Sequence, residues 1–255
     1  MKIGLALGSG GARALASIGV IKVLEKNNIE ITEISGSSMG ALIGAYYCAH
    51  LEIDGLEKKV LSMGKKDFLK LVDMNNPFKS MIKGQKIRVF IEKLIGVQDF
   101  SQLKLPLKII ASDLLKAEEV ILNKGSLTDA IMASICIPGL FPPIQKGTSM
   151  LVDGGILNAT PIEVLSTRLK IGVDYLITEK HVPKLDIFNT LSLSFSLMRK
   201  VGASGKLINT NKTVIIQPKT GLELEGLMRF DKVKNFIEAG EKAAQKSIRR
   251  INNLK

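Results

Sequence analysis

The chain has 255 residues, of which 45% are apolar and 24% are charged. This composition is that of an ordinary globular protein with a core, and it excludes a fibrous or intrinsically disordered chain. The net charge of +12 suits an anionic partner such as a phospholipid surface, a nucleic acid or an acidic substrate, and it is equally common in proteins without such a partner.

The cysteines and the hydropathy pattern bear on location. Cys48 and Cys136 stand in apolar surroundings without metal-ligand spacing, so we expect reduced core residues. The first residues lack the length and flanks of a signal peptide, and no apolar stretch approaches the roughly 18 residues that span a bilayer. We therefore expect a cytoplasmic protein that at most touches a membrane from outside. No repeat or linker divides the chain, so we expect one domain over residues 1–255.

The predicted elements begin with a buried parallel strand at residues 3–7 and a helix over 14–26. Gly8 to Arg13 join them in a glycine-rich turn. The turn lacks the last glycine of the dinucleotide fingerprint, where Arg13 stands, and the Gly-Lys-Ser/Thr ending of a phosphate loop. What remains is a row of backbone N–H groups at a helix start, which suits a negatively charged oxygen. A turn without a ligand is the alternative.

The second predicted unit is a strand at 29–34, the turn Gly36-Ser37-Ser38-Met39-Gly40 and a helix to about residue 49. Gly-x-Ser-x-Gly between a strand and a helix predicts a nucleophile elbow that exposes Ser38 at the start of the helix. The flanking glycines make room for a strained backbone. A Gly/Ser loop before a helix is the plainer interpretation.

Residues 58–88 differ from the rest of the chain, with nine basic residues against two acidic ones and large apolar residues between them. Such a mixture suits a surface that lies on an anionic membrane. The alternative is a helical cap with a solvated face.

From residue 105 strands and helices alternate again, with strands at 107–111, 119–122 and 150–152, a helix from 126 or 127 to about 135, and a proline-rich loop at 137–143. The strand at 150–152 ends in Asp153-Gly154-Gly155. Open α/β sheets place their sites at such strand ends, although a simple turn is the alternative. Further on we predict helices at 162–169, 185–207 and 230–252, a strand within 171–178 and another at 213–217.

A nucleophilic serine needs a base. His50 ends the helix about three turns from the elbow, and His181 follows a strand end without a surrounding motif. Asp153 is the better candidate, because its apolar neighbours are expected to raise its pKa by desolvation toward the range useful to a base.

Three motifs in this order, Gly10-Gly11-Ala12-Arg13, Gly36 to Gly40 and Asp153-Gly154-Gly155, resemble those of the patatin-like phospholipases. The stretches 133–143 and 151–162 look like the bacterial members. The resemblance covers residues 3–165 and is faint over 166–255. It implies a three-layer α/β/α sandwich with a largely parallel central sheet.

The resemblance also implies a Ser-Asp dyad, with Ser38 as nucleophile and Asp153 as general base, and neither a metal nor an organic cofactor. Backbone N–H groups of Gly10, Gly11 and Met39 would hold the oxyanion. The residues that support the motifs are Gly8, Arg13, Gly36, Gly40, Gly154 and Gly155. The chain departs from the family at Ala14, usually glycine, and at Ser17, where bacterial members often have histidine; both positions bear on the oxyanion loop.

The sequence thus predicts a serine acyl hydrolase of the phospholipase A or lysophospholipase type, which cleaves lipid esters through an acyl-Ser38 intermediate. Transfer of the acyl group to an acceptor other than water stays open, because the same acyl-enzyme serves both reactions. A lipid-binding regulatory protein without activity also stays open, and only Ala14 and Ser17 favour it. We expect no nucleic-acid partner, because the chain has three tyrosines, no tryptophan and no binding motif.

Overall fold

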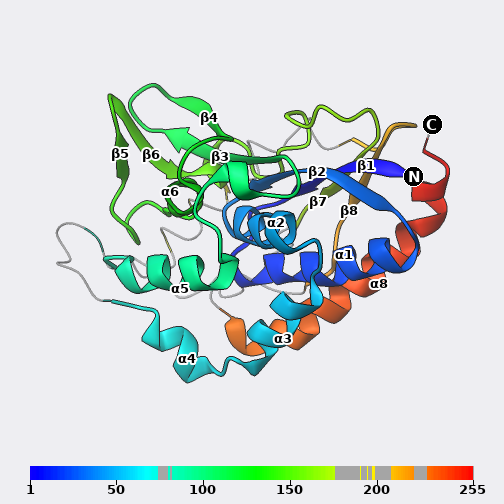
Figure 1. Cartoon of the computed structure of the whole chain (residues 1–255), viewed down its shortest axis with the longest axis horizontal. Helices are drawn as coiled ribbons and strands as arrows, with labels where there is room; N and C mark the ends of the chain where they lie inside the picture. Colours follow the sequence, from blue (N-terminus) through cyan, green and yellow to red (C-terminus); the bar gives the residue numbers. More distant parts are fainter. Residues whose placement is uncertain are drawn as a thin grey trace.

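A computed structural model describes residues 1–73, 80, 82–175, 190, 194, 197–198, 208–220 and 229–254. Its strands are β1 (Lys2–Leu7), β2 (Glu30–Ser37), β3 (Leu107–Asp113), β4 (Glu118–Leu122), β5 (Ile144–Lys146), β6 (Ser149–Asp153), β7 (Lys170–Val173) and β8 (Thr213–Ile216). In the described residues these eight strands form one sheet of order β5-β6-β3-β2-β1-β7-β8, and β4 pairs with β3 (Figure 1). The run from β3 to β8 is parallel, whereas β4, β5 and β6 pair antiparallel. The predicted α/β fold with a largely parallel sheet is confirmed.

The α-helices are α1 (Ala16–Lys26), α2 (Met39–His50), α3 (Asp54–Ser62), α4 (Lys65–Lys70), α5 (Gln85–Ile95), α6 (Leu127–Ser134) and α8 (Val233–Asn252). In the described part of the chain, helices follow β1 and β2, three of them (α3, α4 and α5) stand in a row before β3, and α8 follows β8. Short 3-10 helices are η1 (Gly11–Leu15), η2 (Phe100–Gln102), η3 (Gly154–Ile156) and η5 (Phe230–Lys232). The helix predicted from residue 14 therefore begins as a 3-10 turn and becomes α-helical at Ala16.

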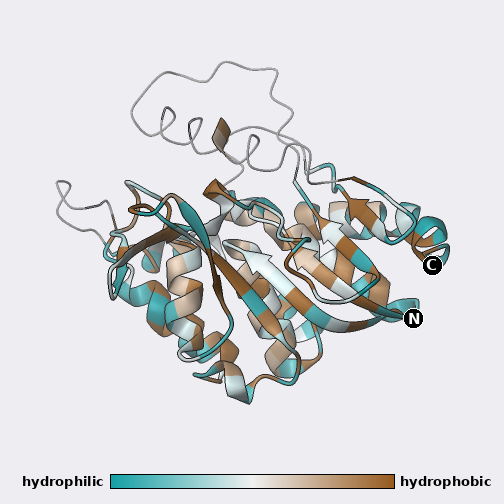
Figure 2. Ribbon diagram, turned by 90° about the horizontal axis from the view of Figure 1, so that it is seen from above, coloured by the Kyte–Doolittle hydropathy of each residue, from teal (hydrophilic) through white to brown (hydrophobic). Residues whose placement is uncertain are grey.

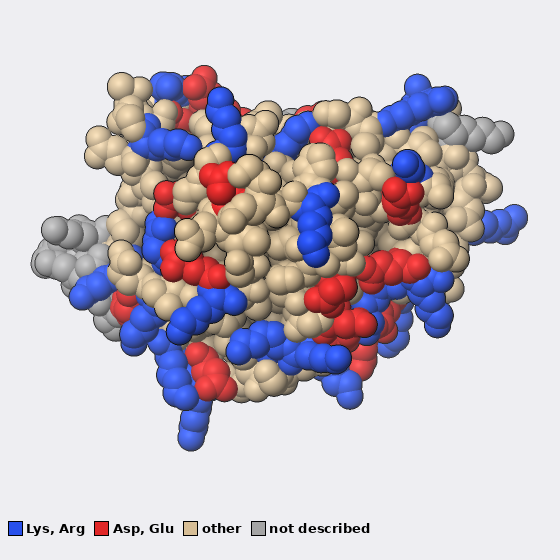
Figure 3. Space-filling model, in the orientation of Figure 1, with Lys and Arg blue, Asp and Glu red and all other residues tan. Residues whose placement is uncertain are grey.

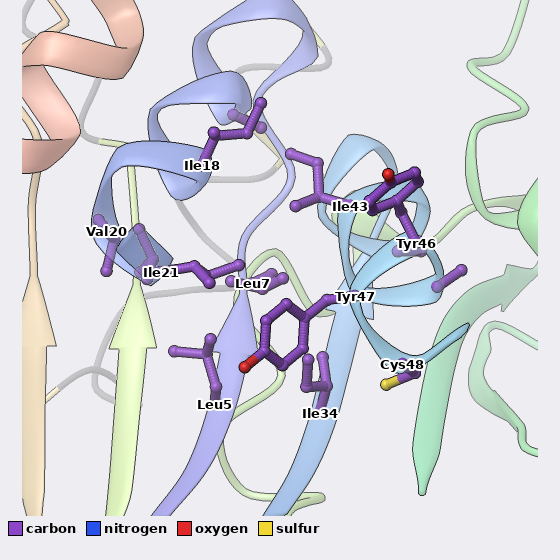
Figure 4. Close-up of a cluster of buried hydrophobic side chains, with 14 of the residues drawn as sticks. Leu5, Leu7, Ile18, Val20, Ile21, Ile34, Ile43, Tyr46, Tyr47 and Cys48 are labelled. Carbon is purple, nitrogen blue, oxygen red and sulfur yellow. The ribbon is translucent and has the colours of Figure 1, made fainter. Parts of the chain in front are cut away.

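The main core lies between the sheet and the helices on one of its faces. Leu5 and Leu7 of β1 and Ile34 of β2 point toward α1 and α2, where Ile43 meets them (Figure 4). These strands are buried on both faces, which explains their nearly continuous apolar sequence. Figure 2 shows this as apolar colour on the central strands and hydrophilic colour at the periphery.

The first and last long helices, α1 and α8, pack tightly against each other on this face. A Cβ atom on Gly240 of α8 would overlap the carbonyl oxygen of Ala16, and one on Gly19 of α1 would overlap that of Ile237. The two glycines thus let the helix backbones touch. Phe236 and Ile237 anchor the inner face of α8 in the core.

The other face of the sheet, over β1 and β7, is covered by residues 159–167, and here one prediction is wrong. The segment 162–169 contains turns and bends instead of a helix. The buried carboxylate of Glu33 accepts the N–H groups of Ser166 at 2.7 Å and Thr167 at 3.1 Å, and Lys108 donates to the Val164 carbonyl at 2.7 Å. Side chains of the sheet therefore satisfy backbone groups that a helix would have paired internally.

Two predictions on the C-terminal part differ in outcome. The strands β7 and β8 and the helix α8 confirm the elements predicted in 171–178, 213–217 and 230–252. The helix predicted at 185–207 falls almost wholly outside the described residues, and so does His181. Among the helices that the structure describes, none is both long and apolar enough to cross a bilayer.

Candidate active site

Ser38 lies in a sharp turn between the last residue of β2 and the first of α2. Its backbone angles are φ 56° and ψ −126°, a strained conformation for a residue with a side chain. The Ser38 N–H donates a hydrogen bond to Ser134 Oγ at 2.8 Å, and the Ser134 hydroxyl donates to the Ile110 carbonyl at 2.6 Å. Ser134 of α6 thus ties the strained turn to β3.

The glycines on either side of Ser38 are required by close backbone contacts. A Cβ atom on Gly40 would overlap the Leu7 carbonyl at the end of β1, and one on Gly36 would press on the backbone of Ala41. The start of α2 is therefore seated directly on the end of β1. Any other residue at either position would push the turn out of place.

Asp153 lies beside the Ser38 turn, on a strand that runs in the opposite direction to β2. It is the last residue of β6, which pairs antiparallel with the second half of β3, while β2 pairs with the first half. β4 pairs with residues 109–113 along one edge of β3. β2 and β6 therefore share the opposite edge of β3, where they meet end to end. The sequence reasoning expected the carboxyl end of a strand in a parallel sheet. The position is right, but β6 runs antiparallel.

The structure brings Ser38 and Asp153 into direct contact. Ser38 Oγ donates a hydrogen bond of 2.6 Å to Asp153 Oδ2. The Gly155 N–H donates to the other carboxylate oxygen, Oδ1, at 2.7 Å. This second bond fixes the carboxylate so that Oδ2 faces the serine.

The main chain of Asp153 is held on both sides. The Ser112 hydroxyl donates to the Asp153 carbonyl at 3.0 Å, and the Asp153 N–H donates to the Cys136 carbonyl at 2.9 Å. A Cβ atom on Gly154 would overlap the Ile110 carbonyl, so this glycine lets η3 sit against β3. Asp153 is fully buried and its neighbour Cys136 has a pKa raised to about 12, mainly by burial and also by the charge of Asp153.

The glycine loop after β1 places the start of η1 beside Ser38. Gly8 and Ser9 donate their N–H groups to the Val173 and Ala159 carbonyls at 2.9 and 2.7 Å. Gly10 and Gly11 open η1, and the first N–H groups of a helix have no partner within it. Gly11, in a left-handed conformation with φ 55°, lines one cavity with Ser38 and Met39.

The loop is supported from within by a buried arginine. Arg13 Nε lies 3.5 Å from the Gly10 carbonyl in a long hydrogen bond. Tyr175, which the sequence reasoning did not find, packs its ring against Gly10 and donates its hydroxyl proton to the Ala14 carbonyl at 3.1 Å. Because that phenol has a single proton, Ser17 is the donor in the short bond between the Ser17 and Tyr175 hydroxyls. Ala14 and Ser17, where the chain departs from the family pattern, therefore both bind the hydroxyl of Tyr175.

His50 lies away from the site. It is the last residue of α2, about 18 Å along the helix axis from the elbow, and its ring packs 4.3 Å from that of Tyr46. Within the part of the chain that the structure describes, no three His, Cys, Asp or Glu side chains gather as metal ligands would.

Ser38 opens into a cavity of about 580 Å³, a size within the usual range of small-molecule pockets, about 300–1,000 Å³. Its wall is almost wholly apolar, apart from Ser38 and the ion-paired Arg229 and Asp231. The apolar wall is formed by Leu15, Met39, Leu42, Ile43, Leu56, Val60, Phe68, Leu71, Val72, Ile82, Ile87, Phe90, Ile91, Leu94, Ile135, Ile137, Leu140, Phe141 and Phe230. The nucleophile candidate thus lines a space suited to a hydrocarbon chain.

The family model of the patatin-like phospholipases matches residues 5–166, which hold Ser38, Asp153 and the glycine loop. The chain belongs to the patatin-like phospholipase family. An uncharacterised NTE family protein of Mycobacterium tuberculosis is 37% identical over 161 residues, 63% of this chain and 44% of that protein. Neuropathy target esterase of Drosophila melanogaster is 33% identical over 168 residues, 64% of this chain and 12% of the relative. The chain therefore spans less than half the length of either relative.

Solved structures share the fold of this patatin-like chain. VipD of Legionella pneumophila superposes with a TM-score of 0.56 and 14% identity, covering 98% of this chain and 66% of VipD. The type III effector protein ExoU gives a TM-score of 0.54 and 12% identity, covering 100% of this chain and 54% of ExoU. At these identities the likeness bears on the fold alone.

Proposed function

We propose that this patatin-like protein is a lipid ester hydrolase of the phospholipase A or lysophospholipase type. The observation that carries the proposal is the 2.6 Å hydrogen bond to Asp153 from Ser38, which lines an apolar cavity of about 580 Å³. Family membership and the similarity to a protein named neuropathy target esterase add support.

The proposed reaction begins when Ser38 Oγ attacks the ester carbonyl and Asp153 Oδ2 accepts the hydroxyl proton. The tetrahedral oxyanion accepts hydrogen bonds from the N–H groups of Gly10, Gly11 and Met39. Asp153 returns the proton to the leaving alcohol as the ester C–O bond breaks, which leaves an acyl group on Ser38. Asp153 then takes a proton from water, whose oxygen attacks the acyl carbon, and the released serine regains its proton from Asp153.

Each part of this site has a characteristic contribution to the rate. A positioned general base contributes about 10²–10⁴-fold, and a single oxyanion donor about 10²–10³-fold. The hydrogen bond from the Gly155 N–H to Asp153 Oδ1 leaves Oδ2 facing Ser38. The carboxylate therefore needs no reorientation before Oδ2 accepts the serine proton. This preorganisation favours a dyad that works without histidine.

The test is covalent labelling with a fluorophosphonate, combined with hydrolysis of a panel of phospholipids, lysophospholipids and neutral lipids. We expect labelling of the wild-type protein and none of Ser38→Ala. Ser37→Ala, one residue earlier in the same turn, should still be labelled. Asp153→Asn keeps the shape but cannot accept the proton, so its kcat should fall by about 10²–10⁴-fold. A wild-type protein that takes up no label would contradict the proposal.

Products of the same reactions separate hydrolysis from acyl transfer. We expect free fatty acid as the product even when an alcohol is added. If the added alcohol is acylated and no fatty acid forms, the protein is an acyltransferase.

We also propose that the protein acts in the cytoplasm. Its two cysteines, Cys48 and Cys136, are both buried free thiols, which suits a reducing compartment.

A further inference from the structure

The helix α4 has two chemically different sides. Phe68 lines the cavity, whereas Lys66 and Lys70 are exposed. Two residues along an α-helix correspond to a rotation of about 200°, so the lysines lie on the side of α4 opposite Phe68. One short helix therefore separates the apolar cavity from a basic outer surface.

The neighbouring helices α3 and α5 repeat this arrangement. Leu56 and Val60 of α3 line the cavity, while Lys58 and Lys59 are exposed. On α5, residues 87, 90, 91 and 94 face the cavity, and Lys86 and Lys93 face solvent. Large apolar side chains are exposed among these lysines: Leu61 on α3 is 46% exposed and Val89 on α5 is 47% exposed.

We define the lysine face by six residues on α3, α4 and α5: Lys58, Lys59, Lys66, Lys70, Lys86 and Lys93. Figure 3 shows lysine and arginine side chains, with acidic side chains between them, along the lower edge of the molecule, where Figure 1 places α3, α4 and part of α8. Of the predicted basic stretch 58–88, residues 74–79 and 81 lie outside the described residues.

The acidic groups of these helices are mostly engaged in local contacts. Asp67 binds Lys70 at 3.1 Å, and Glu57 binds Lys22 of α1 at 2.7 Å. Asp73 accepts N–H groups at the start of α5, and Asp129 of α6 binds Arg88 at 2.6 Å. Asp54 and Glu92 are exposed and reduce the positive charge only in part. The lysine face keeps a positive net charge.

The wall between the lysine face and the cavity includes an aromatic contact. Phe68 of α4 stacks on Phe230 of η5 with ring centroids 4.3 Å apart, and both side chains line the cavity. The contact joins two segments far apart in the sequence.

We propose that the lysine face docks the protein on a bilayer that contains anionic phospholipids, with the cavity directly above the lipid. Lysines near such a surface attract it electrostatically, and Leu61 and Val89 add apolar contact with the interface. The inference rests on the proposed function only in assuming that a lipid enters the cavity. Docking itself depends on the charge and exposure of the three helices.

The experiment compares two variants that lose the same charge. The docking variant carries Lys→Gln at Lys58, Lys59, Lys66 and Lys93. The control variant carries Lys→Gln at exposed lysines elsewhere, Lys26, Lys124, Lys146 and Lys212. Partition of each onto vesicles of phosphatidylcholine with phosphatidylglycerol, and onto phosphatidylcholine alone, is measured by sedimentation. Hydrolysis of a water-soluble butyryl ester is measured in parallel.

We expect the docking variant to partition several hundredfold more weakly on anionic vesicles, on the order of 600-fold, because each of the four lysines contributes about a fivefold factor. The control variant should change by only a few-fold, and both variants should hydrolyse the soluble ester like wild type. Equal losses in the two variants, or no loss in either, would overturn the proposal.

A measurement on the wild-type protein tests docking even if the variants misfold. Partition of the wild type should fall steeply with added NaCl and be weak on phosphatidylcholine alone. Salt-independent partition, or no preference for anionic vesicles, would also overturn docking. If the wild type binds as expected but cleaves no ester, the proposed function fails and the docking inference stands.

Discussion

Ser134 is the residue through which three parts of the site are joined. It lies at the end of α6, accepts the Ser38 N–H and donates to Ile110 of β3. Without this hydroxyl, two buried backbone groups would lose their partner, and each unsatisfied group costs about 1–3 kcal/mol. The strained turn of Ser38 is therefore stabilised from a helix almost a hundred residues further along the chain.

Glu33 predicts how stability depends on pH. Burial raises the pKa of Glu33, but the hydrogen bonds from Lys108 and from the N–H groups of Ser166 and Thr167 outweigh burial and leave it below its ordinary value of 4.5. The unfolded chain then binds the proton more readily, so this stabilisation is present above about pH 4.5 and is lost as the pH falls through the folded-state pKa.

Glu33→Gln should lower the free energy of unfolding near pH 7 by about 1–3 kcal/mol and flatten its decline in acid. Urea denaturation across pH 3–7 measures both effects. Glu30→Gln is the matched control, because Glu30 lies in the same strand but is exposed and forms a long ion pair with Lys2. Similar curves for the two variants would show that Glu33 does not hold the 159–167 segment.

At the scale of the elements, α5 forms part of the wall of the cavity. Ile87 lines the cavity, whereas Val89, two residues later, faces solvent. Ile87→Trp should reduce hydrolysis of palmitoyl esters by more than about tenfold, because losing room for two methylenes costs about 1.6 kcal/mol. Butyryl esters should react as in wild type.

Val89→Trp places the same side chain on the outer side of α5, away from the cavity, and should leave both rates unchanged when the esters are presented without vesicles. Steady-state rates on the two esters of the same alcohol measure the effect. Equal losses on palmitoyl and butyryl esters in Ile87→Trp would mean that this cavity does not receive the acyl chain.

Elements whose signals are local could be predicted from the sequence. The strand at 3–7, the turn at 36–40 and the helix that follows depend on neighbouring residues, and the structure contains all three. The 162–169 segment could not be predicted, because Glu33 and Lys108, which bind its backbone, are more than fifty residues away. For the same reason the antiparallel direction of β6 beside the end of β2 could not be predicted, because only the pairing of β6 with β3 determines it.

In the candidate site, too, some residues have a local sequence signal and others depend on distant contacts. Ser38 and Asp153 stand in recognisable motifs, and the structure brings them within 2.6 Å. Ser134, Ser112 and Tyr175 act through contacts with distant backbone and carry no pattern of their own. Ser134 and Ser112 could have been suspected only from small polar residues within otherwise apolar elements.

At the scale of the whole molecule, the contact between α1 and α8 holds the N- and C-terminal parts together. Alanine in place of glycine usually stabilises a helix interior, by about 1 kcal/mol. Gly240→Ala should do the opposite and destabilise the protein by about 1–3 kcal/mol, because its Cβ atom would overlap the Ala16 carbonyl.

Urea denaturation of Gly240→Ala measures this sign reversal. Lys242→Ala, at an exposed position of the same helix, should change stability by much less. A stabilised Gly240→Ala protein would mean that the two helices are further apart than described.

The α1–α8 contact also has a consequence for how the chain acquires its structure during synthesis. Ser38 and Asp153 have both left the ribosome well before α8, yet α8, which packs against α1, is made more than two hundred residues after α1. Contacts of such long range form late and slow the final folding step. A nascent chain that already carries Ser38 and Asp153 should therefore remain a substrate for chaperones until α8 is made.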